Sequence, residues 1–370
     1  MTKQHSTALT PQSDLEMLNR QIKTWGQELG FQQIGITDVN LAEHEAHLKK
    51  WLANSYHGNL DYMARHGSKR SRPDELIPGT LRVISVRMDY LTMDARSSQP
   101  QDDNNLAQVS RYAQGRDYHK LMRKRLAQLA NKINNHAKQH NYRAFVDSAP
   151  VLERALAEKA GLGWIGKNTM LLNREAGSYF FLGEIFTDLP LTPEDFSPKN
   201  HCGQCTACLD VCPTNAFVEP YVLDARKCIS YLTIELKDSI PEPLRPLMGN
   251  RIFGCDDCQT ICPWNRFANF SGEDDFKPRN NLDASELITL FNWSEADFLE
   301  KTAGSAIRRT GYQGWMRNIA VALGNAPTSP AVLSALEEKR IQSSALVKEH
   351  VDWALAQHKK SRPGNSSFKS

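Results

Sequence analysis

Hydrophobic positions in the first half of the chain alternate between helical and strand spacing. Over 13–30 the apolar residues Leu15, Leu18, Ile22, Trp25 and Leu29 recur at helical intervals, which predicts an amphipathic helix. The same reasoning predicts helices over 41–54, 117–140 and 149–160, and strands over 31–39, 81–90 and 142–148. Two further strands, 169–173 and 178–187, are expected to pair with each other around a turn. This alternation predicts a first domain of the α/β or α+β kind.

The pattern changes after residue 187. The stretch 188–200 is polar and rich in proline, which predicts a domain boundary, and a cysteine-rich segment then runs to about residue 265. Beyond residue 300 the spacing is helical, with segments 310–325 and 329–341 separated by a turn that contains proline. Two such units hint at helical repeats. The polar tail 359–370 is expected to be disordered.

Composition and charge narrow the function classes. The 370 residues are 40% hydrophobic and 24% charged, which excludes disordered, collagen-like and coiled-coil classes. A net charge of +3 excludes a strongly basic, histone-like binder, although a local basic patch remains possible. The chain has no apolar run long enough for a membrane span, and its first residues lack the apolar core of a secretory signal. We therefore expect a cytoplasmic protein without membrane association.

Eight cysteines, all between 202 and 262, carry the strongest chemical signal. The first run, Cys-x2-Cys-x2-Cys-x3-Cys-Pro, has the spacing of ferredoxins, in which the fourth cysteine binds the other [4Fe–4S] cluster. The second run lacks its first cysteine, and Cys228 is the one candidate left to supply it. The predicted ligands are therefore crossed: Cys202, Cys205, Cys208 and Cys262 hold one cluster, and Cys212, Cys228, Cys255 and Cys258 hold the other.

Two zinc sites are the alternative, because Cys-x2-Cys pairs also bind zinc. The tight three-cysteine turn and the two Cys-Pro pairs favour clusters. A radical-SAM motif would need cysteines at positions 215 and 265, where Asn215 and Asn265 stand. Clusters of this kind carry one electron each, so a long segment before them suggests that the first domain holds the electron acceptor.

Two stretches of the first domain resemble known binding motifs, but their sequence context does not support those motifs. GLGWIG (161–166) follows a predicted helix and precedes a predicted hairpin, unlike a dinucleotide fingerprint, and Asn168 replaces the Ser or Thr of a Walker A loop. Its glycines allow two interpretations, a close approach to a large ligand and a plain turn. The cobalamin lower-ligand motif DxHxxG fails at Asp117 because position 122 is Met122. His119 is therefore predicted to be an ordinary helix residue.

Several long strings together resemble the epoxyqueuosine reductase family. They are SRYAQGRDYH (110–119), VDSAPVLERALAEKAGLGWIGKNTMLLN (146–173), GSYFFLGEI (177–185), CGQCTACLDVCPTNAF, CISYLTIELK, GCDDCQTICPWN and RRTGYQGWMRNIAVALGN (308–325). The resemblance extends from about residue 40 to 325. It covers much more than the cysteines, and it includes the first domain.

The resemblance implies an α+β protein with three parts. These are a nitroreductase-like α/β cobalamin domain (1–190), a ferredoxin-type two-cluster domain (191–266) and a HEAT-like helical tRNA-binding region (267–358). The implied activity is reduction of the epoxide of epoxyqueuosine, at the wobble position of tRNA, to queuosine, with electrons passing through two [4Fe–4S] clusters to cobalamin. The related reductive dehalogenases hold their corrinoid without a histidine ligand, which agrees with the missing DxHxxG. The implied partners are a tRNA anticodon stem-loop and a low-potential electron donor, and the expected state is a monomer.

The resemblance also implies roles for individual residues. Asp147 would be the proton donor, with a pKa raised beside a large apolar cofactor, whereas a cap for the helix after Pro150 is the structural alternative. The implied cofactor contacts are Arg70, Ser110, Tyr112, Asp147, Lys167, Asn168, Thr169 and Ser178, with Ser230 and Tyr231 reaching the same cavity.

Basic residues point to the nucleic acid. Residues 301–370 contain eleven basic and four acidic side chains, and phosphate contacts are expected there at Arg308, Arg309, Arg317 and Lys339. A second basic patch comprises Arg65, Lys69, Arg70 and Arg72. A solvated helix face is the alternative.

Two other functions are compatible with the cysteines. One is a ferredoxin-type electron carrier without a substrate, and the other is a reductive dehalogenase-like enzyme acting on a small molecule. A bound corrinoid would separate the carrier from both enzymes, and tRNA binding would separate the two enzymes.

Overall fold

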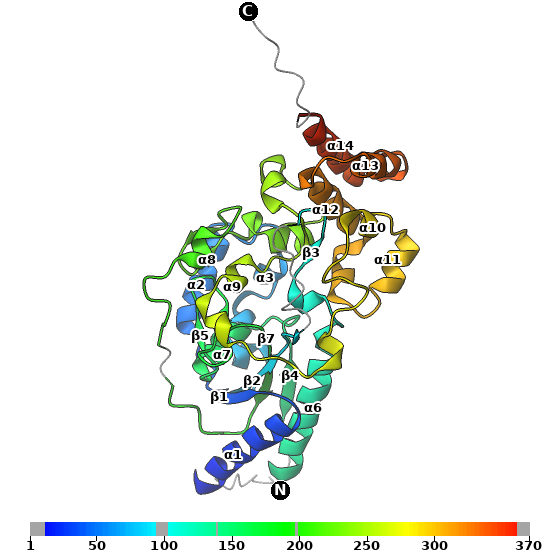
Figure 1. The fold of residues 1–370 in the computed structure, drawn as a ribbon. Coiled ribbons are helices and arrows are strands. Elements are labelled where there is room, and N and C mark those ends of the chain that lie inside the picture. The colour runs from blue at the N-terminus through cyan, green and yellow to red at the C-terminus, as the bar shows by residue number, and fades with distance from the viewer. Residues whose placement is uncertain (1–11, 94–102, 138–139, 197–198, 361–370) are drawn as a thin grey trace, which may run out of the picture.

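The computed structural model describes residues 12–93, 103–137, 140–196 and 199–360 (Figure 1). The first part is built on an antiparallel sheet of order β1-β2-β7-β4, whose strands are β1 (Gln33–Thr37), β2 (Arg82–Asp89), β7 (Phe180–Thr187) and β4 (Tyr142–Phe145). Ile84 of β2 lies opposite both Ile36 of β1 and Ile185 of β7. This register keeps one set of apolar side chains on each face, because neighbouring residues of a strand point to opposite faces.

Helices cover both faces of this sheet. On one face, α1 (Gln12–Glu28) and α6 (Tyr118–Ala137) bury Ile22 and Met122 against Ile84. On the other face, α7 (Glu153–Lys159) buries Leu156 against Phe186. Each fully buried side chain of this size contributes about 1.5–3 kcal/mol. The sheet is therefore a central layer, and the observed class is α+β.

Shorter elements complete the first part and the cysteine segment. The helices are α2 (Ala42–Ala53), α3 (Tyr62–Arg65), α4 (Pro73–Leu76), α8 (Ala207–Asp210) and α9 (Asp257–Thr260), and a π-helix, η4, spans Tyr231–Glu235. The 3₁₀ turns are η1 (Gly67–Arg70), η2 (Arg111–Ala113), η3 (Ala225–Lys227), η5 (Glu242–Leu244), η6 (Pro246–Met248), η7 (Pro263–Phe267), η8 (Asp274–Phe276) and η9 (Ala306–Thr310). The short strands are β3 (Gln108–Val109), β5 (Trp164–Ile165), β6 (Leu171–Leu172), β8 (Phe217–Glu219), β9 (Val222–Leu223) and β10 (Arg251–Phe253).

The C-terminal part is helical and shares a core with the cysteine segment. Its helices are α10 (Leu287–Phe291), α11 (Glu295–Lys301), α12 (Gly311–Asn325), α13 (Pro330–Gln342) and α14 (Ala345–Lys360). The predicted helices 310–325 and 329–341 correspond to α12 and α13, and α14 packs against both. A segment of the first part enters this core, because β3 pairs in parallel with β10 and Val109 packs in the same cluster as Trp315. The tail 361–370 lies outside the described residues.

Most predicted elements of the first part are observed, and two predictions need correction. The helix expected over 149–160 begins at Glu153, because the chain turns at Ala149 and Pro150 first. The expected pairing of 169–173 with 178–187 is wrong: β6 pairs with β5, whereas β7 pairs with β2 and β4. All eight residues of β7 are buried, so this strand belongs at the centre of the sheet, where both of its edges are paired. One bridge, between Asn173 and Gly177, remains of the expected hairpin.

The GLGWIG stretch forms the turn from α7 to β5. Gly161 has a φ of 79°, in the left-handed region, and ends the helix. A Cβ at Gly163 would lie 2.1 Å from the carbonyl oxygen of Leu172, so only glycine allows β5 and β6 to approach this closely. Among the described residues, no helix is long and apolar enough to cross a bilayer.

Candidate active site and iron–sulfur centres

Four of the eight thiols surround one cavity. A cavity of about 200 Å³ is lined by Cys202, Cys205, Cys208 and Cys262, together with side chains that include Lys167 and Trp264. The first three cysteines lie on α8 and the loop before it, whereas Cys262 follows α9. Burial, together with the charge of the neighbouring Cys262, raises the pKa of the Cys208 thiol to about 11. The structure therefore brings Cys262 to the first cysteine run, as the crossed arrangement expects.

The other four thiols influence one another. Burial raises the pKa of Cys258 well above its usual range, and the neighbouring Cys228 and Cys212 raise it further. Burial likewise raises the pKa of Cys255, with a contribution from Cys228. No three His, Cys, Asp or Glu side chains among the described residues converge as ligands of a single ion. The charge of Cys208 also raises the pKa of Cys258, so the two groups of thiols lie near each other, and the crossed assignment of ligands stays a prediction.

Two predicted cofactor contacts lie on the cluster loops. Lys167 Nζ donates to the carbonyl oxygens of Gly203 (2.7 Å) and Cys205 (3.0 Å). Asn168 Nδ2 donates to the carbonyl oxygen of Cys258 at 3.1 Å. The turn after β5 therefore joins both cysteine sets. The adjacent Thr169 has a φ of 63°, and its carbonyl oxygen accepts a hydrogen bond from the guanidinium of Arg154.

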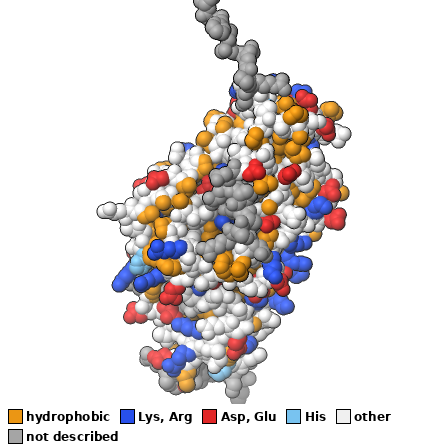
Figure 2. Space-filling model, viewed as in Figure 1, with side chains coloured by type: hydrophobic (Ala, Val, Ile, Leu, Met, Phe, Trp, Pro, Cys, Tyr) orange, Lys and Arg blue, Asp and Glu red, His pale blue; other side chains and the backbone are white. Residues whose placement is uncertain are grey.

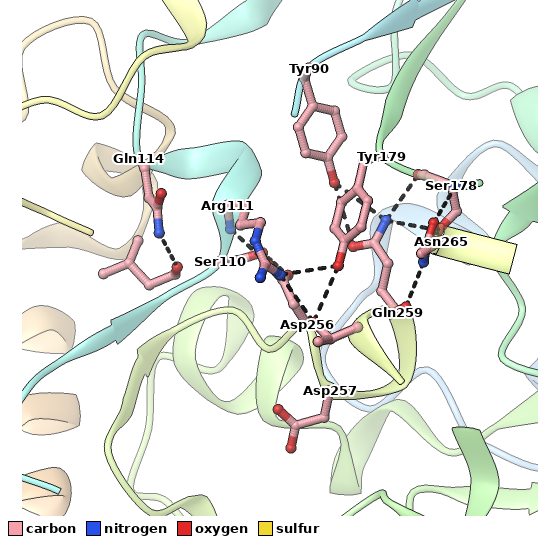
Figure 3. Close-up of polar contacts among 12 residues, drawn as sticks. Tyr90, Ser110, Arg111, Gln114, Ser178, Tyr179, Asp256, Asp257, Gln259 and Asn265 are labelled. Carbon is pink, nitrogen blue, oxygen red and sulfur yellow. Dashed lines mark hydrogen bonds and ion pairs between the residues drawn. The ribbon is translucent and has the colours of Figure 1, made fainter. Parts of the chain in front are cut away.

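Ser110 and Ser178 belong to a buried polar network around α9 (Figure 3). The Ser110 hydroxyl donates to Asp256 Oδ1, and the backbone N–H of Arg111 donates to Asp256 Oδ2 at 2.8 Å. Gln259 Nε2 donates to the carbonyl oxygen of Ser178 at 2.9 Å, and Asn265 Nδ2 donates to its hydroxyl at 3.1 Å. Both serine hydroxyls are thus hydrogen-bonded within the protein, where they tie the first part to the cluster segment.

The remaining predicted cofactor contacts lie on other elements. Tyr231 is buried, and its hydroxyl accepts from the backbone N–H of Asn59 at 3.0 Å. Ser230 is half-buried and hydrogen-bonds to the Cys228 thiol. Arg70 is 6% exposed; its Nη2 donates to the Tyr62 carbonyl at 2.6 Å, while its Nε has no partner among the described residues.

Asp147 lies at the centre of a set of proton-carrying groups. Its Oδ1 is in contact with Nε2 of His119, and its Oδ2 accepts a hydrogen bond from the Tyr118 hydroxyl. His119 Nδ1 lies 2.6 Å from Asp117 Oδ1. Burial opposes protonation of His119, but hydrogen bonds to Asp117 and Asp147 outweigh it and raise the His119 pKa to about 9. The imidazole is therefore protonated at neutral pH, and His119 is not the ordinary helix residue that the sequence suggested.

The expected pKa shift of Asp147 is wrong in direction. Burial favours the protonated carboxyl, but hydrogen bonds from His119 and Tyr118 outweigh it and hold the Asp147 pKa below its usual range. The cap interpretation is wrong as well, because Leu152 is the N-cap of α7. Sequence reasoning missed His119 and Tyr118. The available signal was their position beside Asp117 at the start of a long helix.

Asp147 interacts electrostatically with Tyr112 and Glu153, because its charge raises the pKa of both. Each of these side chains reaches solvent, yet burial is the largest influence on the pKa of each. The Tyr112 ring lies 6.4 Å from the ring of Tyr118, which hydrogen-bonds to Asp147, and 6.3 Å from the ring of Phe253 in the cluster segment. We call this group of three residues the Asp147 recess.

The expected tRNA contacts differ in accessibility. Arg308 is exposed, and Arg309 pairs with Glu235 at 2.9 Å. Lys339 is half-buried, with its ammonium 5.3 Å from the centroid of the Phe291 ring. In the face shown in Figure 2, basic side chains form separate groups interspersed with acidic ones.

Arg317 must be removed from the expected phosphate contacts. It is 0% exposed, and its Nη2 donates to the carbonyl oxygen of Leu232 at 2.7 Å. Its Nη1 donates to the carbonyl oxygens of Leu236 (2.9 Å) and Asp238 (2.7 Å). All these carbonyls belong to the π-helix η4 or the residues just after it. Arg317 therefore completes the hydrogen bonds at the end of that helix and does not reach the surface.

The second basic patch is partly occupied by internal ion pairs. Arg72 pairs with Glu45 and Glu75, at 2.9 and 2.7 Å. Arg65 and Lys69 are exposed. Arg65 and Lys69 are therefore the members of this patch that face solvent, whereas Arg70 is buried and Arg72 pairs with the buried Glu45.

The fold and the thiols define an iron–sulfur protein of the double-cluster class. Residues 201–265 match the family model of the 4Fe-4S double cluster binding domain, and residues 70–148 match the model described as epoxyqueuosine reductase QueG, DUF1730. The epoxyqueuosine reductase of Pseudomonas aeruginosa is 64% identical over 345 residues, covering 93% of this chain and 96% of that protein. The chain belongs to the epoxyqueuosine reductase family.

Solved structures agree with this assignment. The crystal structure of an epoxyqueuosine reductase with an epoxyqueuosine-modified tRNA-Tyr stem loop matches with a TM-score of 0.83 and 29% identity, over 93% of this chain and 91% of that one. The Bacillus subtilis epoxyqueuosine reductase, with its catalytic aspartate loop swung out of the active site, matches with a TM-score of 0.81 and 27% identity, over 93% and 91%. The matches span the first part as well as the clusters, which a simple electron carrier would not require.

Proposed function

We propose that this protein reduces the epoxide of epoxyqueuosine in the anticodon stem-loop of tRNA, giving queuosine and water. The observation that carries the proposal is the arrangement of the site. A proton-holding pair, His119 with Asp147, lies close to Tyr112, which also interacts with Asp256 in the segment bearing eight thiols. Relatives of the same length act on this substrate by name, and a relative of known structure holds a modified tRNA stem loop.

Two [4Fe–4S] clusters fit the thiols of this chain. Four of the thiols line one cavity. Among the other four, the charges of neighbouring thiols raise the pKa of Cys258 and Cys255. Four cysteine thiolates per cluster is the usual ligand set. All eight thiols are free of disulfides, as ligands in a reducing compartment must be. We therefore assign the protein to the cytoplasm, with a low-potential one-electron carrier as its donor and a monomer as its working state.

Cobalamin fits the Asp147 recess. The recess is accessible but poorly hydrated, as a large and mostly apolar cofactor requires, and the donor on Arg70 Nε still lacks a partner among the described residues. Arg70, Tyr112, Thr169 and Ser230 would border the cofactor, whereas Ser110, Lys167, Asn168, Ser178 and Tyr231 hold the surrounding loops. When bound, cobalamin supplies the strongly reducing centre at which electrons reach the substrate. His119 is already bonded to Asp117 and Asp147, so it would not serve as a ligand of the cofactor.

The side chains of His119, Asp147 and Tyr118 hold and transfer protons. Opening the epoxide and releasing its oxygen as water takes two electrons and two protons. His119 Nε2 holds a proton against Asp147 Oδ1, and the Tyr118 hydroxyl fixes the other carboxylate oxygen. Asp147 is thus placed to pass that proton to the departing oxygen as negative charge develops there. Arg308 and Arg309 lie in η9, and Arg309 pairs with Glu235 at the end of the π-helix η4. These two arginines would contact the tRNA backbone.

An anaerobic assay tests this function. Protein reconstituted with iron, sulfide and cobalamin is mixed with a strong reductant and a stem-loop that carries epoxyqueuosine. Mass spectrometry of the nucleosides should show the loss of one oxygen atom. Unchanged epoxyqueuosine, with both clusters and cobalamin bound, would contradict the proposal.

A further inference from the structure

A carboxyl group lies inside the sheet without a partner. Glu184, in the middle of β7, is 0% exposed, and neither of its carboxyl oxygens has a hydrogen-bond partner among the described residues. It shares the α7 side of the strand with Leu182 and Phe186. Ser85, directly opposite on β2, is also 0% exposed and also has an unpartnered hydroxyl. A buried carboxylate without partners is so costly that the group must carry a proton, bind internal water, or both.

A second carboxyl group, that of the half-buried Glu153, interacts electrostatically with both Glu184 and Asp147. Glu153 is the first residue of α7, and its Oε2 is buried with no partner among the described residues. Burial and then the charge of Asp147 raise the pKa of Glu153 to about 8. Burial raises the pKa of Glu184 well above its usual range, and the charges of Glu153 and Asp147 add to the shift. The three carboxyl groups are therefore close enough to interact.

Other charged groups facing Glu153 act in the opposite direction. Arg154 on the same helix and His119 on α6 both lower its pKa, but they do not outweigh burial. From the sheet, Glu184 is the titratable group next to it, and Ser85 is polar but does not titrate at ordinary pH. At neutral pH Glu153 therefore holds a proton and the buried Glu184 favours its protonated form, while Asp147 is ionised beside protonated His119.

The reaction needs more protons than Asp147 and His119 hold. As two electrons enter, both C–O bonds of the epoxide break, the alkene forms, and the oxygen leaves as water with two protons. The pair of His119 and Asp147 supplies one proton. The second proton must come from another protonated side chain or from bulk water. The bound cofactor and the tRNA would shield the residues around Asp147 from bulk water.

We propose that Glu153, with Glu184 behind it, is that second store and passes its proton to Asp147 during each reduction. This inference rests on the proposed function. It assigns a task to two glutamates whose buried carboxyl oxygens, Oε2 of Glu153 and both oxygens of Glu184, have no hydrogen-bond partner in the described part of the chain. Glu153 would regain its proton from solvent after the product leaves and the recess opens.

Infrared spectroscopy tests the store without any turnover. The carbonyl band of a protonated carboxylic acid is separate from that of a carboxylate, and it is measured on the cofactor-loaded protein between pH 6 and 10 without substrate. Glu153→Gln should remove one such band that titrates near pH 8, whereas the exposed Glu16→Gln on α1 should leave all bands unchanged. Retention of every band in Glu153→Gln would overturn the proposal, whatever the activity of the protein.

Single-turnover kinetics test the transfer. Glu153→Gln keeps size and shape but cannot supply a proton, so it should slow queuosine formation about a hundredfold and abolish the fall in rate above pH 8. Glu184→Gln should slow it in the same direction if Glu153→Gln proves unstable. A wild-type rate and pH profile in both variants would overturn the proposal, and so would a loss of cobalamin affinity that accounts for the whole effect. If the wild type itself fails to reduce the substrate, the proposed function falls while the infrared result still decides whether Glu153 is protonated.

Discussion

His119 Nε2 is in contact with Asp147 Oδ1, although His119 lies in α6 and Asp147 lies 28 positions further on, in the turn after β4. The contact reverses the expected behaviour of Asp147. A carboxyl group in a poorly hydrated recess would normally hold its proton, but here the proton lies on the imidazole. The acid of this site is therefore a pair of residues that must be tested together.

Asp147→Asn should lose most turnover and keep its cofactors. The amide preserves the shape of the side chain, but it cannot relay a proton from His119, so the rate should fall about a hundredfold or more. Because Leu152 caps α7, the substitution should leave the fold intact. Single-turnover conversion and the visible spectrum measure both properties. A near-normal rate would show that Asp147 does not handle the proton.

His119 should make stability depend on pH in a defined window. Its folded-state pKa of about 9 lies above the ordinary value of 6.5, so its stabilising contribution is complete below pH 6.5 and is lost as pH rises through 9. The difference in unfolding free energy between wild type and His119→Gln should therefore shrink over this range, by at most about 3 kcal/mol. Anaerobic urea unfolding at several pH values measures it. A difference that stays constant with pH would show that His119 is not charged through Asp117 and Asp147.

Arg317→Met should destabilise the protein and should not act through tRNA. The substitution leaves the carbonyls of Leu232, Leu236 and Asp238 without their donor, at a cost of about 3 kcal/mol or more. Arg317→Lys should recover only part of this, because one ammonium cannot reach all three oxygens with the guanidinium geometry. The exposed Arg308→Lys is the matched control and should change stability by less than about 0.5 kcal/mol. Equal stability of all three variants would contradict the assigned role.

Cys262→Ser should damage the cluster of the other cysteine run. Wild-type protein should contain about eight iron atoms, four per cluster, and Cys262→Ser should lose the cluster held by Cys202, Cys205 and Cys208. Cys258→Ser should spare that cluster and lose the other. Iron analysis combined with EPR of the reduced proteins distinguishes the two. Loss of the same cluster in both variants would mean that the ligands are not crossed.

Arg308→Glu and Arg309→Glu should weaken binding of the tRNA stem-loop. Each phosphate contact releases a counterion, so affinity should fall and its dependence on salt concentration should become shallower. Arg20→Glu, on the exposed side of α1, serves as the control for a general change in charge. Fluorescence anisotropy at several salt concentrations measures both quantities. Unchanged affinity would leave η9, the turn that carries both arginines, outside the tRNA interface.

Charged residues within apolar elements show what sequence reasoning could have found. Arg317 lies in α12, which is apolar around most of its circumference, and such a helix is usually buried on every side. A lone arginine there is more reasonably a buried donor than a phosphate contact. Glu184 stands in the same way within an otherwise apolar strand. Both positions could have been marked as buried charges, but their partners could not have been named.

The sequence alone determined the features that depend on neighbours in the chain. Cysteine spacing sets which thiols can meet on one tight turn, and apolar periodicity sets where α1, β2 and α6 form, because both are local geometry. The tertiary structure alone decided which strand β7 pairs with, where Arg317 points and where the proton of Asp147 lies. Each of these depends on groups brought together from distant parts of the chain, and hydration, pairing and charge at such a contact arise only when the core closes around it.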